Sequence, residues 1–331
     1  MLEQKVDLQI GALIAIAASW VLLLYAGCAT ADEVPGGEID LDLTPNFQLD
    51  DGSDLHSLAD AATRNLLTPV RGRGARFGPR QKDRYCRLKG SNSVQWAVND
   101  LSTGEVLSRS PGADRLFFGA STSKIFVAAA FLDKQKGEPN KEQLGLLARM
   151  IVVSNNGAWL ALQRQTGNDG TNDGGRAAVD AFVKRMGYPT IKGFQGWMKR
   201  PDGSRVHGNE LNAMEVAQFL RDTYQRKYEG ADVLWKIMQA TKTGGSKLNK
   251  YTPSDVYISG KTGTYSGPNE SPQTVNLPTI KSRNHAAAVS IDGRMYGLVV
   301  LTNTGDNEDV AVLGGGLQRE YLGVTPKVSC P

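Results

Sequence analysis

The sequence predicts an α+β domain in which an antiparallel sheet is closed by its first and last strands. Two strand pairs carry this prediction: residues 94–100 and 105–107 flank one turn, and residues 286–291 and 296–301 flank another. Six segments of helical character lie between them: 121–135, 141–153, 156–165, 175–186, 212–228 and 231–240. Strands at both ends with helices between them indicate flanking helices and an inserted all-helical subdomain.

Composition excludes several classes of protein. The 331 residues are 40% hydrophobic and 22% charged, with a mean hydropathy of −0.33, which excludes a polytopic membrane protein, a fibre and a wholly disordered chain. The net charge of +4 is too small for a dedicated nucleic-acid binder. Three cysteines and three histidines are too few for a zinc ribbon or a disulfide scaffold.

The first 31 residues predict export. Residues 8–31 carry no charge and residues 10–26 are nearly all apolar, which fits either a signal sequence or a single membrane anchor. The segment Leu24–Cys28 resembles a bacterial lipoprotein processing box with Cys28 as the lipidated residue. Cleavage with lipidation and an uncleaved anchor both stay open. Either way, we expect a membrane-anchored protein that faces the periplasm or the cell exterior.

The next segment, residues 32–84, reads as a flexible tether. Residues 32–60 hold nine acidic and no basic side chains, whereas residues 61–89 hold nine basic and one acidic. Glycine and proline interrupt both blocks, and no apolar period is sustained. We interpret the segment as a solvated linker that leads to a single domain over residues 85–331.

Two cysteines bracket that domain. Export would place Cys86 and Cys330 in an oxidising compartment, and the two ends of a domain often lie close together. A disulfide between them is therefore expected, with two unpaired thiols as the alternative.

A serine and a lysine open the first predicted helix. Residues 125–132 are apolar almost all round, so this helix should be buried. Ser121 and Lys124 are three residues apart and share one face of its first turn. Burial would lower the pKa of the lysine and make it a base for the serine hydroxyl. Alone the pattern is weak, because Ser121 could simply cap the helix.

Two further motifs strengthen the functional interpretation. Ser154-Asn155-Asn156 precedes a helix, and Lys261-Thr262-Gly263-Thr264 follows a predicted strand over residues 255–260. The order Ser-x-x-Lys, Ser-x-Asn, Lys-Thr-Gly resembles the active-site set of the penicillin-recognising serine enzymes, the class A β-lactamases and penicillin-binding D,D-peptidases. The resemblance spans residues 94–320 and implies a β-lactamase/transpeptidase-like fold.

Other interpretations of these residues are weaker. A phosphate-binding loop ending at Gly260-Lys261-Thr262 would need a glycine where Asp255 stands. A second Lys-Thr-Gly at 242–244 follows a helix, and we interpret it as a helix-ending turn. The Gly-x-Ser-x-Gly elbow of a Ser-His-Asp hydrolase is not found.

The resemblance implies a role for each motif residue. Ser121 would be the nucleophile that forms an acyl-enzyme, Lys124 would take or relay its proton, and Ser154 would pass a proton to the leaving group. Lys261 would supply positive potential for a substrate carboxylate, and the N–H groups of Ser121 and Thr264 would form the oxyanion hole. The implied substrate-binding residues are Asn156, Thr262, Gly263 and Thr264. No metal or organic cofactor is required.

One departure from the family pattern bears on the substrate. Class A β-lactamases carry a glutamate that activates the deacylating water, but residues 181–209 contain only one carboxylate, Asp202, in a turn. Glu210 is a weak substitute, because Asn212 and Glu215 beyond it read as a helix capping box. We therefore expect a D,D-peptidase-like hydrolase, with slow deacylation, acting on D-Ala-D-Ala-type wall peptides or β-lactams.

The alternatives are an efficient class A β-lactamase and a catalytically degenerate binding or scaffold protein. We expect a monomer. The pocket walls should come from loops such as 187–209 and 264–284.

Overall fold

The computed structural model describes residues 46–200, 202–269 and 278–331, all within the unit Asp42–Pro331. The predicted signal or anchor segment and Cys28 lie outside these residues. Among the residues described, no helix has the length and apolar character needed to cross a membrane.

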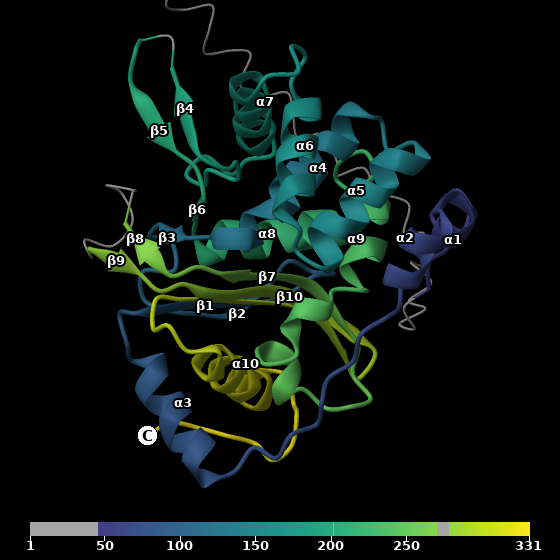
Figure 1. The fold of residues 1–331 in the computed structure, drawn as a ribbon. Coiled ribbons are helices and arrows are strands. Elements are labelled where there is room, and N and C mark those ends of the chain that lie inside the picture. The colour runs from purple at the N-terminus through teal and green to yellow at the C-terminus, as the bar shows by residue number, and fades with distance from the viewer. Residues whose placement is uncertain (1–45, 201, 270–277) are drawn as a thin grey trace, which may run out of the picture. The chain divides into compact units, whose positions relative to one another are not determined.

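A five-stranded antiparallel sheet forms the centre of this unit, with the strand order β2-β1-β11-β10-β7 (Figure 1). Its strands are β1 (Val94–Asp100), β2 (Val106–Arg109), β7 (Ile258–Thr264), β10 (Arg283–Ile291) and β11 (Arg294–Thr302). β1 pairs with β11 along its whole length, so the prediction that the first and last strands close the sheet is confirmed. β7 is an edge strand that runs past the predicted 255–260, so Lys261–Thr264 lie within it.

Helices cover both faces of the sheet (Figure 1). Successive side chains of β1 point to opposite faces: Ala97 joins the core on the side of the helical subdomain, and Trp96 and Val98 join the core under the C-terminal helix. Burial on both faces explains why all seven residues of β1 are buried.

All six predicted helices are present. They are α4 (Lys124–Lys134), α5 (Lys141–Val152), α6 (Asn156–Thr166), α7 (Asn172–Arg185), α8 (Ala213–Tyr224) and α9 (Ala231–Met238). A 3-10 turn, η1 (Ala120–Ser123), replaces the first turn of the segment predicted at 121–135. Two more 3-10 turns, η2 (Lys242–Gly244) and η3 (Leu248–Lys250), follow α9, as the helix-ending interpretation of residues 242–244 predicts.

The C-terminal helix α10 (Asn307–Tyr321) was not predicted, because three consecutive glycines interrupt its apolar pattern. The packing requires those glycines: a β-carbon on Gly314 would lie 1.7 Å from Leu248 Cδ2, and one on Gly316 would lie 2.2 Å from Tyr85 Cδ2. Close contact with neighbouring side chains therefore offsets the low helix propensity.

In the described residues, three two-stranded sheets lie outside the main sheet. They pair β3 (Phe117–Phe118) with β6 (Glu210–Leu211), β4 (Trp197–Lys199) with β5 (Arg205–His207), and β8 (Gly267–Pro268) with β9 (Thr279–Ile280). Two of them belong to the segments expected as loops, 187–209 and 264–284. Asp202 lies in the β4–β5 turn, where its side chain accepts hydrogen bonds from Ser204, as its Pro-Asp-Gly context predicts.

The tether predicted over residues 32–84 is wrong from residue 46 onward. This part forms α1 (Leu55–Leu58), α2 (Ala61–Leu66) and the start of α3 (Pro79–Lys89), and it buries Phe47, Leu55, Leu67 and Phe77. Its apolar residues are too widely spaced to show a period. Backbone hydrogen bonds from residues 70–75 to 239–256 hold the segment in place, and sequence pattern cannot reveal such long-range pairing.

The expected disulfide between Cys86 and Cys330 is present, with Cα atoms 5.4 Å apart. It joins α3 to the chain after α10. Part of the basic block also has partners here. Arg84 pairs with Asp306, which caps α10, and with Asp309 within that helix, and Lys89 pairs with Glu320.

Candidate active site

The three motifs meet beside the start of α4, around the ammonium group of Lys124. Lys124 Nζ lies 3.0 Å from Ser121 Oγ, one turn earlier. The Lys124 side chain is fully buried, whereas Ser121 keeps part of its surface exposed. Ala120, just before the serine, has a φ of +48°, a left-handed conformation that is strained for alanine. The chain therefore holds Ser121 in a geometry that has a conformational cost.

Ser154 and Asn156 reach Lys124 from the turn between α5 and α6. Lys124 Nζ donates to Asn156 Oδ1 at 2.7 Å and lies 2.7 Å and 3.2 Å from the Ser154 carbonyl oxygen and Oγ. Ser154 also has a positive φ, +63°. Asn155, between them, caps α6 through the N–H of Ala158 and so directs its neighbours toward the site.

Lys261, on β7, also contacts Ser154. Its Nζ lies 3.0 Å from Ser154 Oγ and 2.9 Å from the Thr262 carbonyl oxygen. The hydroxyl of Ser154 thus lies between two amines, with Lys124 on one side and Lys261 on the other. This arrangement joins Ser121, Lys124, Ser154 and Lys261 in one chain of hydrogen bonds.

Gly263 lets β7 pack directly against the serine turn. A β-carbon there would lie 2.5 Å from the Gly119 carbonyl oxygen and 2.6 Å from Thr122 Oγ1. Thr264, the next residue, is the single exposed position of β7. The strand end therefore presents Thr264 beside the turn that carries Ser121.

A third lysine, Lys247, was not identified from the sequence. It lies between η2 and η3, is 2% exposed, and donates to Thr264 Oγ1 at 2.9 Å and to the Asn284 carbonyl oxygen at 3.2 Å. It also donates to the Gly263 carbonyl oxygen. The second Lys-Thr-Gly is next to the first, because the hydroxyls of Thr243 and Thr262 are hydrogen-bonded. Lys247 belongs to no motif, so only its buried contacts identify it.

Burial lowers the pKa of all three lysines. Desolvation lowers the pKa of Lys124 to about 8. Desolvation and then the charge of Arg283 lower the pKa of Lys247 to about 7. The pKa of Lys261 lies well below its usual range because of burial first, then Lys124 and Lys247. In the described part of the chain no carboxylate lies within 4 Å of these amines. A substrate carboxylate would therefore meet an uncompensated positive site.

Two further rings, those of Trp159 and His285, lie near the buried lysines. Lys124 Nζ lies 5.0 Å from the centroid of the Trp159 ring, which is buried beneath it. His285 on β10 is opposite Thr262, and its pKa is well below the usual value because of burial, then Lys247 and Lys261. The imidazole is therefore neutral near pH 7.

Glu210, the low-ranking base candidate, is fully buried on β6, opposite Phe118 of β3. The capping box expected beyond it is half formed. Asn212 caps α8 by accepting the N–H of Glu215, but the Glu215 carboxylate accepts the N–H groups of Thr190 and Ile191 instead of returning to Asn212. The N–H groups that compete for the Glu215 carboxylate belong to residues before β4. The spacing of Asn212 and Glu215 in the sequence does not indicate this long-range contact.

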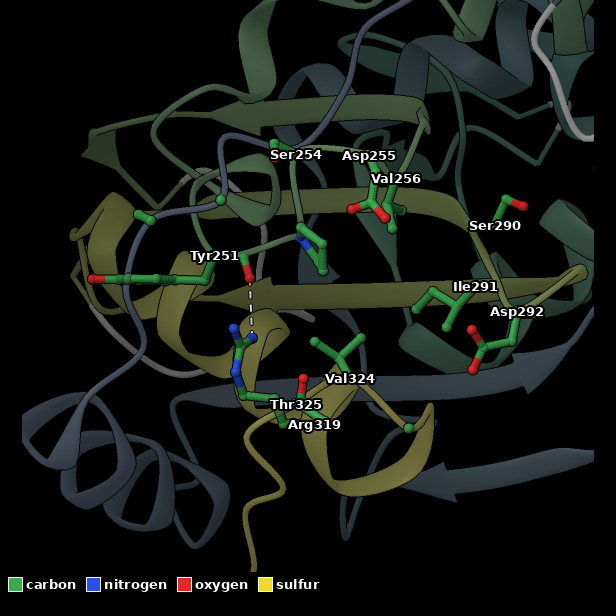
Figure 2. Close-up of a pocket in the computed structure, with 14 residues that line it drawn as sticks. Tyr251, Ser254, Asp255, Val256, Ser290, Ile291, Asp292, Arg319, Val324 and Thr325 are labelled. Carbon is green, nitrogen blue, oxygen red and sulfur yellow. Dashed lines mark hydrogen bonds between the residues drawn. The ribbon is translucent and has the colours of Figure 1, made fainter.

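A hollow of about 750 Å³ lies elsewhere, between residues 251–256, the β10–β11 turn and residues 319–325 (Figure 2). Arg319 lines it and donates to the Tyr251 carbonyl oxygen at 3.0 Å. None of the motif residues lines this hollow, so we do not assign the active site to it. Within the described residues, no group of three His, Cys, Asp or Glu side chains is placed to hold a metal ion.

Comparisons with known proteins agree with this geometry. A family model described as the beta-lactamase enzyme family matches residues 134–314. Similar solved structures include a beta-lactamase from Streptosporangium roseum (18% identity, TM-score 0.56, covering 74% of this chain and 99% of that one) and one from Chitinophaga pinensis (20%, 0.52, 71% and 94%). An ancestral class A beta-lactamase is also similar (19%, 0.53, 71% and 97%). At these identities the likeness shows a shared α+β fold. No curated protein matched the sequence.

Proposed function

Because this chain belongs to the beta-lactamase enzyme family, we propose that it is an exported serine hydrolase whose Ser121 forms an acyl-enzyme with D-Ala-D-Ala-type peptides or β-lactams. We further propose that it releases the acyl group slowly, as a D,D-peptidase-like enzyme. One observation carries the proposal: the hydrogen-bonded chain Ser121–Lys124–Ser154–Lys261, in which both lysines are fully buried and both serines stay partly exposed.

The proposed acylation moves protons between Ser121, Lys124 and Ser154. The Ser121 proton passes over 3.0 Å to neutral Lys124 Nζ as Oγ bonds to the substrate carbonyl carbon. The carbonyl oxygen gains a negative charge, which the N–H groups of Ser121 and Thr264 stabilise. The C–N bond then breaks, and the leaving nitrogen takes the hydroxyl proton of Ser154. Lys124, 3.2 Å away, returns the first proton to Ser154.

The substrate carboxylate binds at the other end of the site. Lys261 supplies the charge, and the hydroxyls of Thr262 and Thr264 donate hydrogen bonds to the carboxylate. Lys247 donates to Thr264 Oγ1, which leaves the threonine's own hydrogen free to point at the substrate. Binding of an anion also favours the charged form of these buried lysines, whose pKa values burial has lowered. Asn156 contacts the amide on the acyl side.

Slow deacylation follows from the groups around Ser121. Lys124 is hydrogen-bonded to two hydroxyls, an amide and a carbonyl, and in the described residues no carboxylate is hydrogen-bonded to Ser121 or Lys124. Water that attacks the ester therefore lacks a carboxylate base of the kind that efficient β-lactamases use. The alternative, a β-lactamase that uses Glu210 as this base, is supported by its position opposite Phe118, three residues before the nucleophile.

The contact between Lys124 and Ser121 argues against a degenerate binding protein. A degenerate site would have no need of a fully buried lysine at 3.0 Å from a strained serine turn, since both features are costly to maintain.

Export is supported by the Cys86–Cys330 disulfide, because such bonds persist in oxidising compartments. We propose that residues 1–31 anchor the protein, with Cys28 as a lipidation site. Mass spectrometry of the purified membrane form should show a lipid-modified N-terminal Cys28 that Cys28→Ala removes. A native N-terminus at Met1 would instead support an uncleaved anchor.

The catalytic proposal is tested by labelling with a fluorescent penicillin, followed by peptide mass spectrometry and a time course of label release. We expect one adduct on Ser121 that decays over many minutes, no adduct on Ser121→Ala, and full labelling of the exposed-serine control Ser57→Ala. Absence of an adduct on Ser121 contradicts the proposal. Release within seconds favours the β-lactamase alternative, in which case Glu210→Gln should trap the adduct.

A further inference from the structure

Four rings form a continuous row beside the proposed active site. They belong to Tyr265, Phe118, His207 and Trp197, which we call the aromatic wall. Successive ring centroids are 4.6 Å apart for Tyr265 and Phe118, 6.0 Å for Phe118 and His207, and 4.7 Å for His207 and Trp197. These spacings lie within the range of favourable aromatic contacts. The row joins three elements that are distant in sequence: β3, the chain after β7, and the β4–β5 hairpin.

One end of the aromatic wall is attached to the catalytic machinery. Phe118 is three residues before Ser121, and its carbonyl oxygen accepts hydrogen bonds from Ser282 Oγ at 3.0 Å and Asn284 Nδ2 at 2.9 Å. Tyr265 directly follows Thr264, and its carbonyl oxygen accepts one from Arg283 Nη1 at 2.8 Å. These hydrogen bonds hold the backbone of Phe118 and Tyr265 close in sequence to the nucleophile and to the proposed oxyanion hole.

The other end is built by one face of the β4–β5 hairpin. Trp197 is paired with His207 and Lys199 with Arg205, so all four side chains share a face. The residues of the opposite face, Met198 and Val206, are buried in the core of the helical subdomain. The hairpin is thus anchored by its apolar face and turns its aromatic and basic face away from that core. Figure 1 shows it rising above β6, on the same side of the molecule as β8 and β9.

The aromatic wall is not simply core. Phe118, Trp197 and Tyr265 are each partly exposed, whereas neighbouring Phe117 and Phe194 are fully buried. At the outer end, the Arg205 guanidinium lies 5.5 Å from the Trp197 ring. Aromatic faces that stay accessible beside a reactive serine can stack on a planar group of a bound substrate.

The direction of β7 decides which part of a substrate reaches this surface. Lys261 and Thr262, proposed to hold the leaving-side carboxylate, precede Thr264 along the strand, and Tyr265 comes after it. A substrate lying along β7 with its carbonyl at Thr264 therefore extends its acyl side toward Tyr265. We propose that the aromatic wall is an acyl-side subsite that selects acyl donors carrying a planar aromatic ring. This inference rests on the proposed acylation of Ser121.

The test compares two probes on the same penicillin nucleus, one with a phenylacetyl and one with an acetyl side chain. Second-order rates of Ser121 acylation are measured for both, and their ratio is the readout. We expect the wild type to prefer the aromatic probe, Trp197→Ala to lose about three- to tenfold of that preference, and Trp197→Phe to retain most of it. The acetyl probe should change less than twofold. The control is Tyr257→Ala, which removes an aromatic ring just before β7 begins, at the end of the strand opposite Thr264. It should leave the ratio unchanged.

Each outcome separates the two proposals. If neither probe acylates wild-type Ser121, the proposed function fails. If both acylate and the ratio is equal in wild type and Trp197→Ala, the aromatic wall is refuted and the function stands. If Trp197→Ala does not fold, the same ratio of acylation rates is measured for Tyr265→Ala, and an unchanged ratio refutes the aromatic wall. A general loss of structure would lower both rates and leave their ratio unchanged, so it cannot imitate a specific loss of the aromatic preference.

Discussion

The pH dependence of Ser121 acylation is a direct consequence of the buried lysines. Acylation needs Lys124 neutral, and its pKa of about 8 makes roughly one molecule in ten competent at pH 7, compared with about one in three thousand at the usual lysine value. Burial therefore raises the reactive fraction about 300-fold, equivalent to about 3 kcal/mol. Taken alone, the titration of Lys124 makes the rate rise with pH with a midpoint at about 8, because the active form is the deprotonated one.

An opposing limb comes from Lys247, which is charged below its pKa of about 7 and orients Thr264 in that form. The product of the neutral Lys124 fraction and the charged Lys247 fraction predicts a bell-shaped profile. Its maximum is near pH 7.5, with rates about sixfold lower at pH 6 and pH 9.

Stopped-flow acylation with a chromogenic penicillin between pH 5.5 and 9.5 measures this profile as the second-order rate constant, which reports the free enzyme. Lys247→Met should lower the rate and remove the alkaline limb, leaving a rise with a midpoint near pH 8. A flat wild-type profile, or a rising limb with its midpoint above pH 9.5, refutes the assignment of Lys124 as the base.

Three substitutions test the structural basis of the site and the domain. Gly263→Ala should reduce acylation more than about 100-fold by pushing β7 off the serine turn. The control is Gly90→Ala, whose β-carbon would make only an ordinary contact, 3.9 Å from the Arg87 carbonyl oxygen. Cys86→Ser should cost about 2–5 kcal/mol in denaturant unfolding while the acylation rate is retained. Leu55→Ala should cost about 2–4 kcal/mol; a negligible loss would restore the tether interpretation.

The motif residues were predictable because their chemistry depends on local spacing. Ser121 and Lys124 share one helical turn, and residues 154–156 and 261–264 each lie in a single turn or strand. Lys247 was not predictable, because nothing in the residues around it indicates burial. Its importance comes from contacts with Thr264 and Asn284, 17 and 37 residues further along the chain.

The glycines of α10 and the basic residues before β1 were the least reliable guides to the fold. The three glycines of α10 lower helix propensity, yet they are what lets Leu248 and Tyr85 approach the helix. The basic residues before β1 read as a solvated linker, but Arg84 and Lys89 have acidic partners on α10. In both cases the deciding neighbour lies far away in the sequence.

The sequence by itself determined the α+β class, the six helices between the closing strands, and the order of the three motifs, because each depends on local periodicity or spacing. Only the tertiary structure decided that residues 46–84 belong to the folded unit, that three buried amines share the site, and that Tyr265, Phe118, His207 and Trp197 form one row. The physical reason is that burial, pKa and ring contact are set by residues brought together from distant parts of the chain. Local sequence patterns do not indicate such long-range contacts.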